Sequence, residues 1–212
     1  ISHDIRTPLT SIVGSASGIL ENQKVLTQER EMELVQDIKD EAQWLIRIVE
    51  NLLSVTRING ENARINTEDE VVEEIISSAV IKFNKRFPEA SVEVKMPEEF
   101  LMVAMDGVLI EQVLVNLLQN ANTHTQGGRI EVRAFLKDGK YQVEITDNGS
   151  GIAPELLPHV FERGVSDGGT GFGLFLSKSV VESHHGKIWI ESRQGEGTKV
   201  SFVLPVYEGQ RG

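Results

Sequence analysis

Apolar residues recur at heptad spacing through about the first quarter of the chain, and no other feature restricts its fold as strongly. The intervals alternate between four and three residues through Ile5, Leu9, Ile12, Ala16 and Ile19. After a break near residues 22–24 the alternation returns through Val35, Ile38, Ala42, Leu45, Val49, Leu52 and Thr56. Such spacing lines apolar side chains along one seam of a helix. Two such helices joined by a few residues predict an antiparallel helical hairpin over residues 1–58.

One hairpin of this kind cannot cover its own apolar surface. A second apolar stripe, formed by Trp44, Ile48 and Val55, lies beside the seam of the second helix. Pairing with a second copy would bury both stripes in a four-helix bundle, so we predict a homodimer through residues 1–58. The alternative is that these faces pack on the rest of the same chain.

The periodicity changes after the hairpin. An Asn-Gly-Glu-Asn run at 59–62 predicts a linker over residues 59–68, followed by a second domain over residues 69–207. In it, helices are expected over 67–83, 108–122 and 174–184, and strands over 91–96, 100–105, 129–136, 141–146, 187–192 and 199–204. Asp138-Gly139 separates two of these strands and is a strong hairpin signal. The mixture predicts a two-layer α/β sandwich with helices on one face of the sheet.

The charge balance argues against nucleic acid as a partner. The formal net charge is -11, from six Lys/Arg and nine Asp/Glu in residues 1–58 and fifteen and twenty-three in the rest. Both parts are therefore acidic, and neither composition favours a basic face. An anionic nucleotide would have to be held by a metal ion, backbone N–H groups and a few placed cations.

The composition also bears on location. The chain has no cysteine, which excludes disulfides and thiolate metal sites and fits a reducing cytosol. No apolar run approaches the roughly 18 residues that a membrane-spanning helix needs. The chain begins at Ile1 rather than Met, so we expect a cytoplasmic fragment of a longer protein whose membrane segments lie elsewhere.

The first nine residues combine a histidine, an acid, a threonine and a proline. On a helix His3 and Thr7 share one face, because residues four apart are neighbours. Pro8 has no N–H and would clash with the carbonyl of Asp4, so we expect a bend beside His3. Taken alone, a His-Asp pair is more simply explained as a surface histidine near a helix start.

Two further motifs suit a nucleotide. Asn116 and Asn120 lie one helical turn apart, and their amide oxygens could bind a Mg²⁺ ion that phosphates complete. Capping or a buried polar network would explain two asparagines equally well. Asp147 ends a predicted strand and could accept a hydrogen bond from an adenine amino group, while Gly149 and Gly151 would let the backbone approach the base. The alternative for this motif is an ordinary turn.

The third motif is a glycine-rich run over residues 168–174 that ends where a helix is expected to begin. Glycine N–H groups and a helix N-terminus together bind anions without using positive charge. Alone, such a run could be a flexible loop or part of a different nucleotide fold. The Lys-Ser pair of a P-loop is absent, and no strand directly precedes the run as a dinucleotide-binding fold requires.

In this order the motifs resemble those of bacterial two-component sensor histidine kinases. Residues 1–9 resemble the H-box of a HisKA-type dimerisation hairpin, whose histidine carries the phosphoryl group. The motifs at 116–121, 147–152, 161–163 and 168–174 resemble the N, G1, F and G2 boxes of its ATP-binding domain, and 195–198 the final glycine box. That domain has the Bergerat (GHKL) fold, shared with heat-shock protein 90, type II topoisomerases and MutL. The start and the run 109–114 are most similar to the potassium-responsive KdpD sensors.

The resemblance implies a role for each matching residue. His3 would attack the γ-phosphate of ATP, and Asp4 would orient and activate its imidazole. Thr7 would help to place the water in a phosphatase reaction; alternatively it bonds back to a helix carbonyl. Asn116 and Asn120 would bind Mg²⁺. The other residues expected in the ATP site are His124, Asp147, Gly149, Gly151, Ile152, Phe161, Arg163, Gly169, Thr170, Gly171, Gly173, Leu174 and Thr198. Among these, Asp147 would read adenine and Thr198 would support the base through its hydroxyl.

Two departures from the family pattern stand out. Thr123 and His124 occupy the places of the usual Lys-Tyr pair, which removes a cation near the phosphates, although His124 could stack on the base. Only residues 162–168 separate Phe161 from Gly169, so the ATP lid is short, either naturally, as in some citrate-sensor relatives, or because it was shortened.

The resemblance predicts an ATP-dependent protein-histidine kinase that passes its phosphoryl group to a response-regulator aspartate. Its cofactors would be ATP and Mg²⁺, and the parent protein would be anchored at the inner membrane. The main alternative is a catalytically silent dimeric scaffold, which Thr123 and the short lid would favour. A heat-shock-type ATPase is disfavoured, because such proteins carry no H-box hairpin.

Overall fold

The computed structural model describes residues 2–22, 25–59, 65–97, 102–125, 128–162 and 173–206; the side chains of residues 2–4, 44 and 47–59 fall outside this description. The chain forms two compact units, Ile1–Leu53 and Ser54–Gly212. The expected linker over 59–68 begins at the last residue of a helix and ends at the first residue of a strand, and its centre, 60–64, lies outside the described residues.

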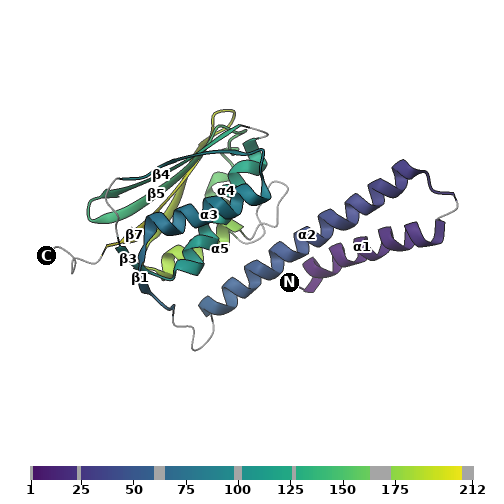
Figure 1. Cartoon of the computed structure of the whole chain (residues 1–212), viewed down its shortest axis with the longest axis horizontal. Helices are drawn as coiled ribbons and strands as arrows, with labels where there is room; N and C mark the ends of the chain where they lie inside the picture. Colours follow the sequence, from purple (N-terminus) through teal and green to yellow (C-terminus); the bar gives the residue numbers. More distant parts are fainter. Residues whose placement is uncertain are drawn as a thin grey trace. The chain divides into compact units, whose positions relative to one another are not determined.

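The first unit is built from two long helices, α1 (Ser2–Asn22) and α2 (Gln28–Asn59), the second of which extends past the boundary (Figure 1). Thr27 caps α2, because its Oγ1 accepts a hydrogen bond from the Arg30 N–H at 3.3 Å. The predicted helical hairpin is therefore confirmed. α1 stays helical across Pro8, and the bend expected beside His3 remains a prediction.

The second unit contains a five-stranded sheet in the order β2-β4-β5-β7-β6. Its strands are β2 (Ser91–Lys95), β4 (Arg129–Lys137), β5 (Lys140–Asp147), β6 (Lys187–Arg193) and β7 (Gly197–Pro205). β2 runs parallel to β4, and the other neighbours are antiparallel. Between β4 and β5, Asp138 and Gly139 have φ angles of 51° and 70°, as a type I′ hairpin turn requires.

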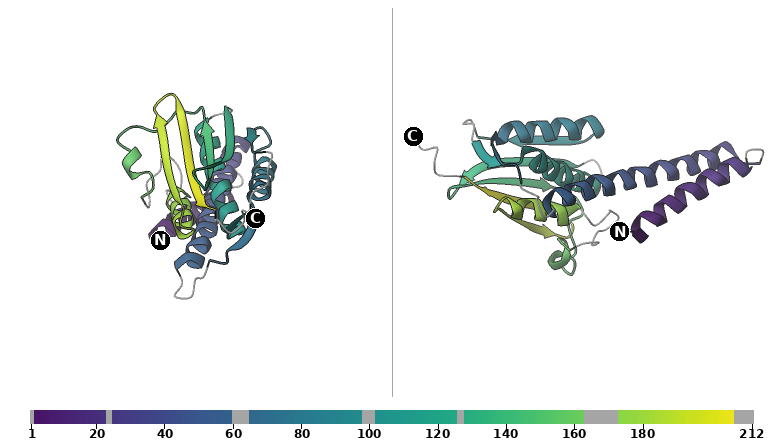
Figure 2. Two further views of the ribbon diagram at one scale, coloured as in Figure 1. Left: turned by 90° about the vertical axis from the view of Figure 1, so that its left-hand side faces the viewer. Right: turned by 90° about the horizontal axis from the view of Figure 1, so that it is seen from below.

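Three helices form the second layer of this unit: α3 (Val72–Arg86), α4 (Gly107–Thr125) and α5 (Gly173–Ser183). α4 and α5 pack on one face of the sheet, and α3 packs against α4 (Figures 1 and 2). Large residues buried between the layers include Phe83, Ile110, Leu114, Leu117, Leu118, Ile130, Tyr141, Ile145, Leu176 and Phe202. The predicted two-layer α/β sandwich is confirmed.

One predicted element is wrong. The run Glu68–Val71 was expected to open a helix, but it forms strand β1, paired antiparallel with β3 (Met102–Met105). The helix α3 begins only after β1, and its N-cap, Val71, makes no side-chain cap. Acidic residues after a threonine are typical of a helix start, but here pairing with a segment more than 30 residues away overrides that local preference.

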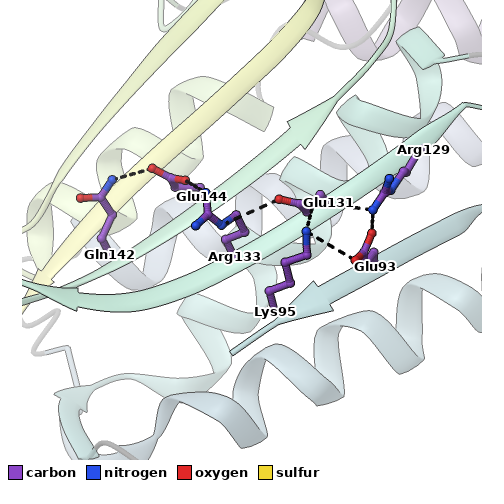
Figure 3. A network of polar contacts seen from close by, with 7 residues as sticks. All are labelled: Glu93, Lys95, Arg129, Glu131, Arg133, Gln142 and Glu144. Atoms are coloured by element: carbon purple, nitrogen blue, oxygen red, sulfur yellow. Dashed lines mark hydrogen bonds and ion pairs between the residues drawn. The ribbon is translucent and has the colours of Figure 1, made fainter. Parts of the chain in front are cut away.

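The face of the sheet opposite the helices carries a network of ion pairs (Figure 3). Lys95 Nζ lies 2.6 Å from Glu131 Oε2, Arg129 pairs with Glu93, and Arg133 lies 3.9 Å from Glu144. Such exposed pairs contribute little to stability, because water and salt screen them. Opposite charges alternate across the strands, so the positive and negative side chains described on this face balance one another. They form no surface of a single sign for a charged ligand.

Candidate functional site

Two half-buried asparagines of α4, Asn116 and Asn120, lie one turn apart on this helix. Neither amide forms a hydrogen bond with any residue that the structure describes, so no polar network within that part of the chain accounts for them. Asn120 lies beside the start of α5, since a Cβ at Gly173 would come within 3.8 Å of its Nδ2 and 3.9 Å of its Oδ1. The free amide group of Asn120 therefore lies beside a helix N-terminus.

Asp147, the last residue of β5, is only 8% exposed. Its Oδ1 accepts the Gly149 N–H at 2.8 Å. Burial raises the pKa of Asp147, while the backbone N–H groups of Gly149 and Thr198 and the nearby His124 oppose the rise. A carboxylate has about four acceptor positions, so this one can still accept hydrogen bonds from a ligand.

The loop after β5 is held on both sides by backbone contacts. The Ser150 N–H donates to the His124 carbonyl at 3.2 Å, and the Gly195 N–H donates to the Ser150 carbonyl at 2.7 Å. A Cβ at Gly149 would collide with the His124 carbonyl. Gly151 has a φ of 66°, and its Cβ would collide with the Arg193 carbonyl. Both positions require glycine, because the loop passes between the end of α4 and the β6–β7 turn.

Ser192, near the end of β6, connects this loop to Thr198 and was not predicted. Its Oγ accepts the Ile152 N–H at 2.9 Å, donates to the Gly197 carbonyl at 2.9 Å and lies 2.9 Å from Thr198 Oγ1. Ser192 pairs with Thr198, which on its other side pairs with Asp147, so all three side chains share one face of the sheet. The sequence did contain a signal for Ser192. It follows Ile188 and Ile190 at every second position of the strand, where an inward-facing residue is expected.

The segment around Phe161 and the start of α5 are also connected. Phe161 and Leu174 are partly buried against the core. Lys178 Nζ lies 5.8 Å from the centroid of the Phe161 ring, within the range of a cation–π interaction. Arg163, Gly169, Thr170 and Gly171 lie outside the described residues.

The structure gathers part of the predicted site and leaves part undescribed. Within the second unit it brings together residues from α4, the β5 loop, the start of α5 and β7: Asn120, His124, Asp147, Gly149, Gly151, Ile152, Gly173 and Thr198. In the first unit, the backbone of His3 and Asp4 lies in α1, but their side chains fall outside the described set, while Thr7 is exposed on α1.

The donor set fits magnesium better than a tightly coordinated metal. Among the described residues, no group of three His, Cys, Asp or Glu side chains could hold a metal ion. Mg²⁺ usually keeps several waters and is bound by few protein oxygens together with substrate phosphates. The amide oxygens of Asn116 and Asn120 meet that description.

Both units match known families. A family model described as "Histidine kinase-, DNA gyrase B-, and HSP90-like ATPase" matches residues 105–208, and one described as "His Kinase A (phospho-acceptor) domain" matches residues 1–61. Both matches agree with the resemblance drawn from the motifs and with a Bergerat-type sandwich.

Similar proteins are sensor kinases. The sensor protein KdpD of Clostridium acetobutylicum is 41% identical over 214 residues, which cover 97% of this chain and 24% of that protein. The solved mycobacterial sensor histidine kinase MprB is 31% identical with a TM-score of 0.60, over 66% of this chain and 97% of that chain. A solved complex of histidine kinase ThkA with the response regulator TrrA has a TM-score of 0.76 at 24% identity, over 99% of this chain and 61% of that chain.

The chain is shorter than its curated relatives. It spans about a quarter of the length of the KdpD relative. Across the described residues, none of the helices is both long enough and apolar enough to cross a membrane.

Proposed function

The chain belongs to the sensor histidine kinase family, and from this premise we propose that it is an ATP-dependent protein-histidine kinase. In the proposed arrangement, residues 1–58 form the phosphotransfer hairpin, 59–68 the linker and 69–207 the ATP-binding domain. The observation that carries the proposal is the buried Asp147 carboxylate, which accepts the backbone N–H of Gly149 and still has lone pairs free.

The base of ATP would bind at Asp147. An adenine amino group is a donor, and the carboxylate is the acceptor that it needs. Gly149 and Gly151 keep the backbone close on either side of the base, and Ile152 and Thr198 would line the same end of the site. His124, exposed at the end of α4, would stack on the base in place of the usual tyrosine.

The phosphates would lie between α4 and the start of α5. Helix N-termini bind phosphate through their free N–H groups, and Gly173 and Leu174 open α5 beside Asn120. Asn116 and Asn120 would hold Mg²⁺, which when bound neutralises phosphate charge during transfer. We assign Phe161 and Arg163 to the support of the lid, and Gly169, Thr170 and Gly171 to its glycine-rich turn.

Thr123 does not replace the lysine usual at its position. Its hydroxyl donates to the Gln119 carbonyl at 2.9 Å, so its proton is used within the helix. The phosphates would therefore be neutralised by Mg²⁺ and backbone N–H groups rather than by a lysine at this position. We expect the affinity for the triphosphate to depend strongly on Mg²⁺.

The acceptor of the phosphoryl group would be His3. An imidazole nitrogen attacks the γ-phosphorus, the bond from that phosphorus to the bridging oxygen breaks, and ADP leaves with the bonding electrons. Asp4 would orient the ring and stabilise its developing positive charge. Phosphoryl transfer depends mainly on positioning and charge stabilisation, which suits a site of amides and backbone dipoles.

The partners would be a second copy of the chain and a response-regulator receiver domain. No heptad residue whose side chain is described is fully buried, so the hairpin seam is available to a second hairpin. The complex of ThkA with TrrA shows a regulator on a protein of the same fold. Because ATP and such regulators are cytosolic, we place this part of the protein in the cytoplasm and its anchor at the inner membrane.

A phosphatase activity toward the regulator is also proposed, through Thr7. It lies one turn after His3 on an exposed part of α1, where a docked receiver domain could meet it. Thr7→Ala should slow dephosphorylation of the phospho-regulator about 100-fold while leaving autophosphorylation unchanged. Equal regulator half-lives with both proteins would leave Thr7 only a structural role.

The test of the kinase assignment is incubation with γ-labelled Mg-ATP. The chain should become labelled, and the His3→Gln variant should remain unlabelled while binding ATP with nearly the same affinity. The label should be lost in acid and stable in alkali, as for a phosphoramidate. An ATP-binding chain that never acquires label would instead support the silent-scaffold alternative.

A further inference from the structure

The hydroxyl group of Ser192 has its full complement of hydrogen bonds. A serine hydroxyl has one hydrogen and two lone pairs. Its hydrogen goes to the Gly197 carbonyl, which can only accept, and one lone pair receives the Ile152 N–H, which can only donate. The remaining lone pair faces Thr198 Oγ1 at 2.9 Å. Thr198 must therefore donate its hydroxyl hydrogen to Ser192.

This direction decides what Thr198 offers to a ligand. With its hydrogen turned toward Ser192, the Thr198 hydroxyl presents only lone pairs, and it has no further hydrogen-bond partner among the described residues. Thr198 stands directly across the strand ladder from Asp147, on the same face of the sheet. The carboxylate of Asp147 is also an acceptor. Two neighbouring side chains thus present acceptors and no donor.

We propose that Ser192 is a positioning residue that fixes the hydrogen-bond direction of Thr198 and thereby makes the base site selective for a 6-amino purine over a 6-oxo purine. This inference rests on the proposed ATP site. A 6-amino group supplies the donors that such a surface needs, whereas a 6-oxo group would leave acceptors facing one another without a hydrogen. If Thr198 were free to rotate, its hydroxyl could donate to the 6-oxo group and weaken the discrimination.

The experiment compares Mg-ATP with Mg-inosine triphosphate by calorimetry on the intact chain. The two nucleotides share ribose and triphosphate, so the ratio of their affinities reports the base alone. Ser192→Ala should lower the preference for ATP about three- to ten-fold, the range of a single neutral hydrogen bond. Ser192→Thr, which keeps a hydroxyl, should restore the preference. Ser192→Cys, of similar size but with a weak donor, should shift it in the same direction as alanine.

A matched control is available on a neighbouring strand. Ser201 of β7 is buried, and its Oγ has no hydrogen-bond partner within the described structure, so Ser201→Ala removes a hydroxyl without touching Thr198. It should leave the ratio unchanged. Thermal melting of each variant establishes that the second unit is folded.

A double-mutant cycle separates positioning from packing. Thr198→Val removes the hydroxyl through which Ser192 is proposed to act, so adding Ser192→Ala to Thr198→Val should not change the ratio further. A persisting change in that background would overturn the inference, as would equal loss of both nucleotides in Ser192→Ala. If the parent chain binds neither nucleotide, the proposed function itself fails. If it prefers ATP but Ser192→Ala leaves that preference intact, only the role of Ser192 fails.

Discussion

The two units of the chain bury their apolar residues to very different degrees. In the second unit, helices and sheet enclose a continuous core in which Phe83, Leu117 and Phe202 are each 1% exposed. In the first, Pro8 is the only buried residue among those of α1 and α2 whose side chains are described. The seam residues Leu9 and Val35 are 47% and 46% exposed.

This difference in burial indicates which of the two units can cover its apolar residues by itself. The second unit has a core and a self-neutralised outer face, so its stability depends on its own packing. The helices of the first unit have a regular apolar seam, and none of its described side chains is fully buried. We propose that a second copy of the hairpin covers this seam.

The largest effect should come from a core truncation in the second unit. Leu117→Ala removes a fully buried side chain and should lower the free energy of unfolding by about 2–5 kcal/mol. Val13→Ala, at a residue that is 63% exposed and lies off the seam, should cost less than about 0.5 kcal/mol. Chemical denaturation of both variants measures the difference. Comparable losses would contradict the contrast.

The next prediction concerns assembly. Leu45 lies on the seam of α2, and Leu45→Glu would place a charge inside the proposed four-helix bundle. Light scattering should show monomers, while calorimetry should show unchanged ATP binding, because the nucleotide site lies in the other unit. A dimer that survives the substitution would place the interface elsewhere.

A third prediction separates binding from stability at Asp147. Asp147→Asn should lower the affinity for ATP at least about ten-fold, since a hydrogen bond to a charged group contributes about 1.5–3 kcal/mol. The pKa of Asp147 is raised by burial, so the ionised carboxylate opposes folding, and the variant without ATP should melt at a higher temperature. Unchanged affinity would remove Asp147 from the base site.

The pH dependence of the second unit should include a contribution from His184. Its Nε2 accepts the Asp106 N–H at 2.9 Å, and its Nδ1 lies 2.8 Å from the Val180 carbonyl, so the neutral ring joins the end of α5 to the start of α4. Burial lowers the pKa of His184 below its ordinary value of 6.5; the hydrogen bond to the Val180 carbonyl and the charge of Asp106 oppose the shift, and His185 adds to it.

The lowered pKa of His184 determines how stability changes with pH. Because the unfolded chain takes up the proton first, the contribution of His184 is complete above about pH 6.5 and is lost as the pH falls below it. Melting temperatures from pH 8 to 5 should show this loss in the parent. His184→Gln should be less stable at pH 8 and show a smaller decline on acidification. Parallel curves would exclude His184 as the titrating group.

The smallest effect should be a gain in stability at His185. This residue has a φ of 58°, a left-handed conformation that ends α5, and the N–H of Gly186 bonds to the Val181 carbonyl. Glycine adopts this conformation without cost, so His185→Gly should stabilise the second unit by about 0.5–1 kcal/mol. Thermal melting at neutral pH measures it. A loss of stability would mean that the side chain makes contacts which outweigh the strain.

Much of the fold followed from local signals. The helix of α4 was predicted because its leucines repeat at helical spacing, and the β4–β5 hairpin because Asp138-Gly139 suits a type I′ turn. The strand β1 was missed because its partner lies more than 30 residues away.

The candidate site likewise contains some residues that the sequence could identify and others that it could not. Asp147 and its glycines form a contiguous motif, so they could be named from the sequence. Ser192 could not be, because its role depends on Ile152, Gly197 and Thr198, which the fold brings together from different segments. His184 and Asp106 were missed for the same reason: they meet only after α4 and α5 pack against each other.

We propose that the first unit accepts the phosphoryl group and the second unit binds ATP. The most direct test is to identify the phosphorylated residue. The intact chain is incubated with Mg-ATP, digested at alkaline pH to preserve a phosphoramidate, and mapped by tandem mass spectrometry. We expect one phosphorylated peptide, from the start of α1, carrying the phosphoryl group on His3. Phosphate on any residue of the second unit, or on a serine or threonine of the hairpin, would contradict it.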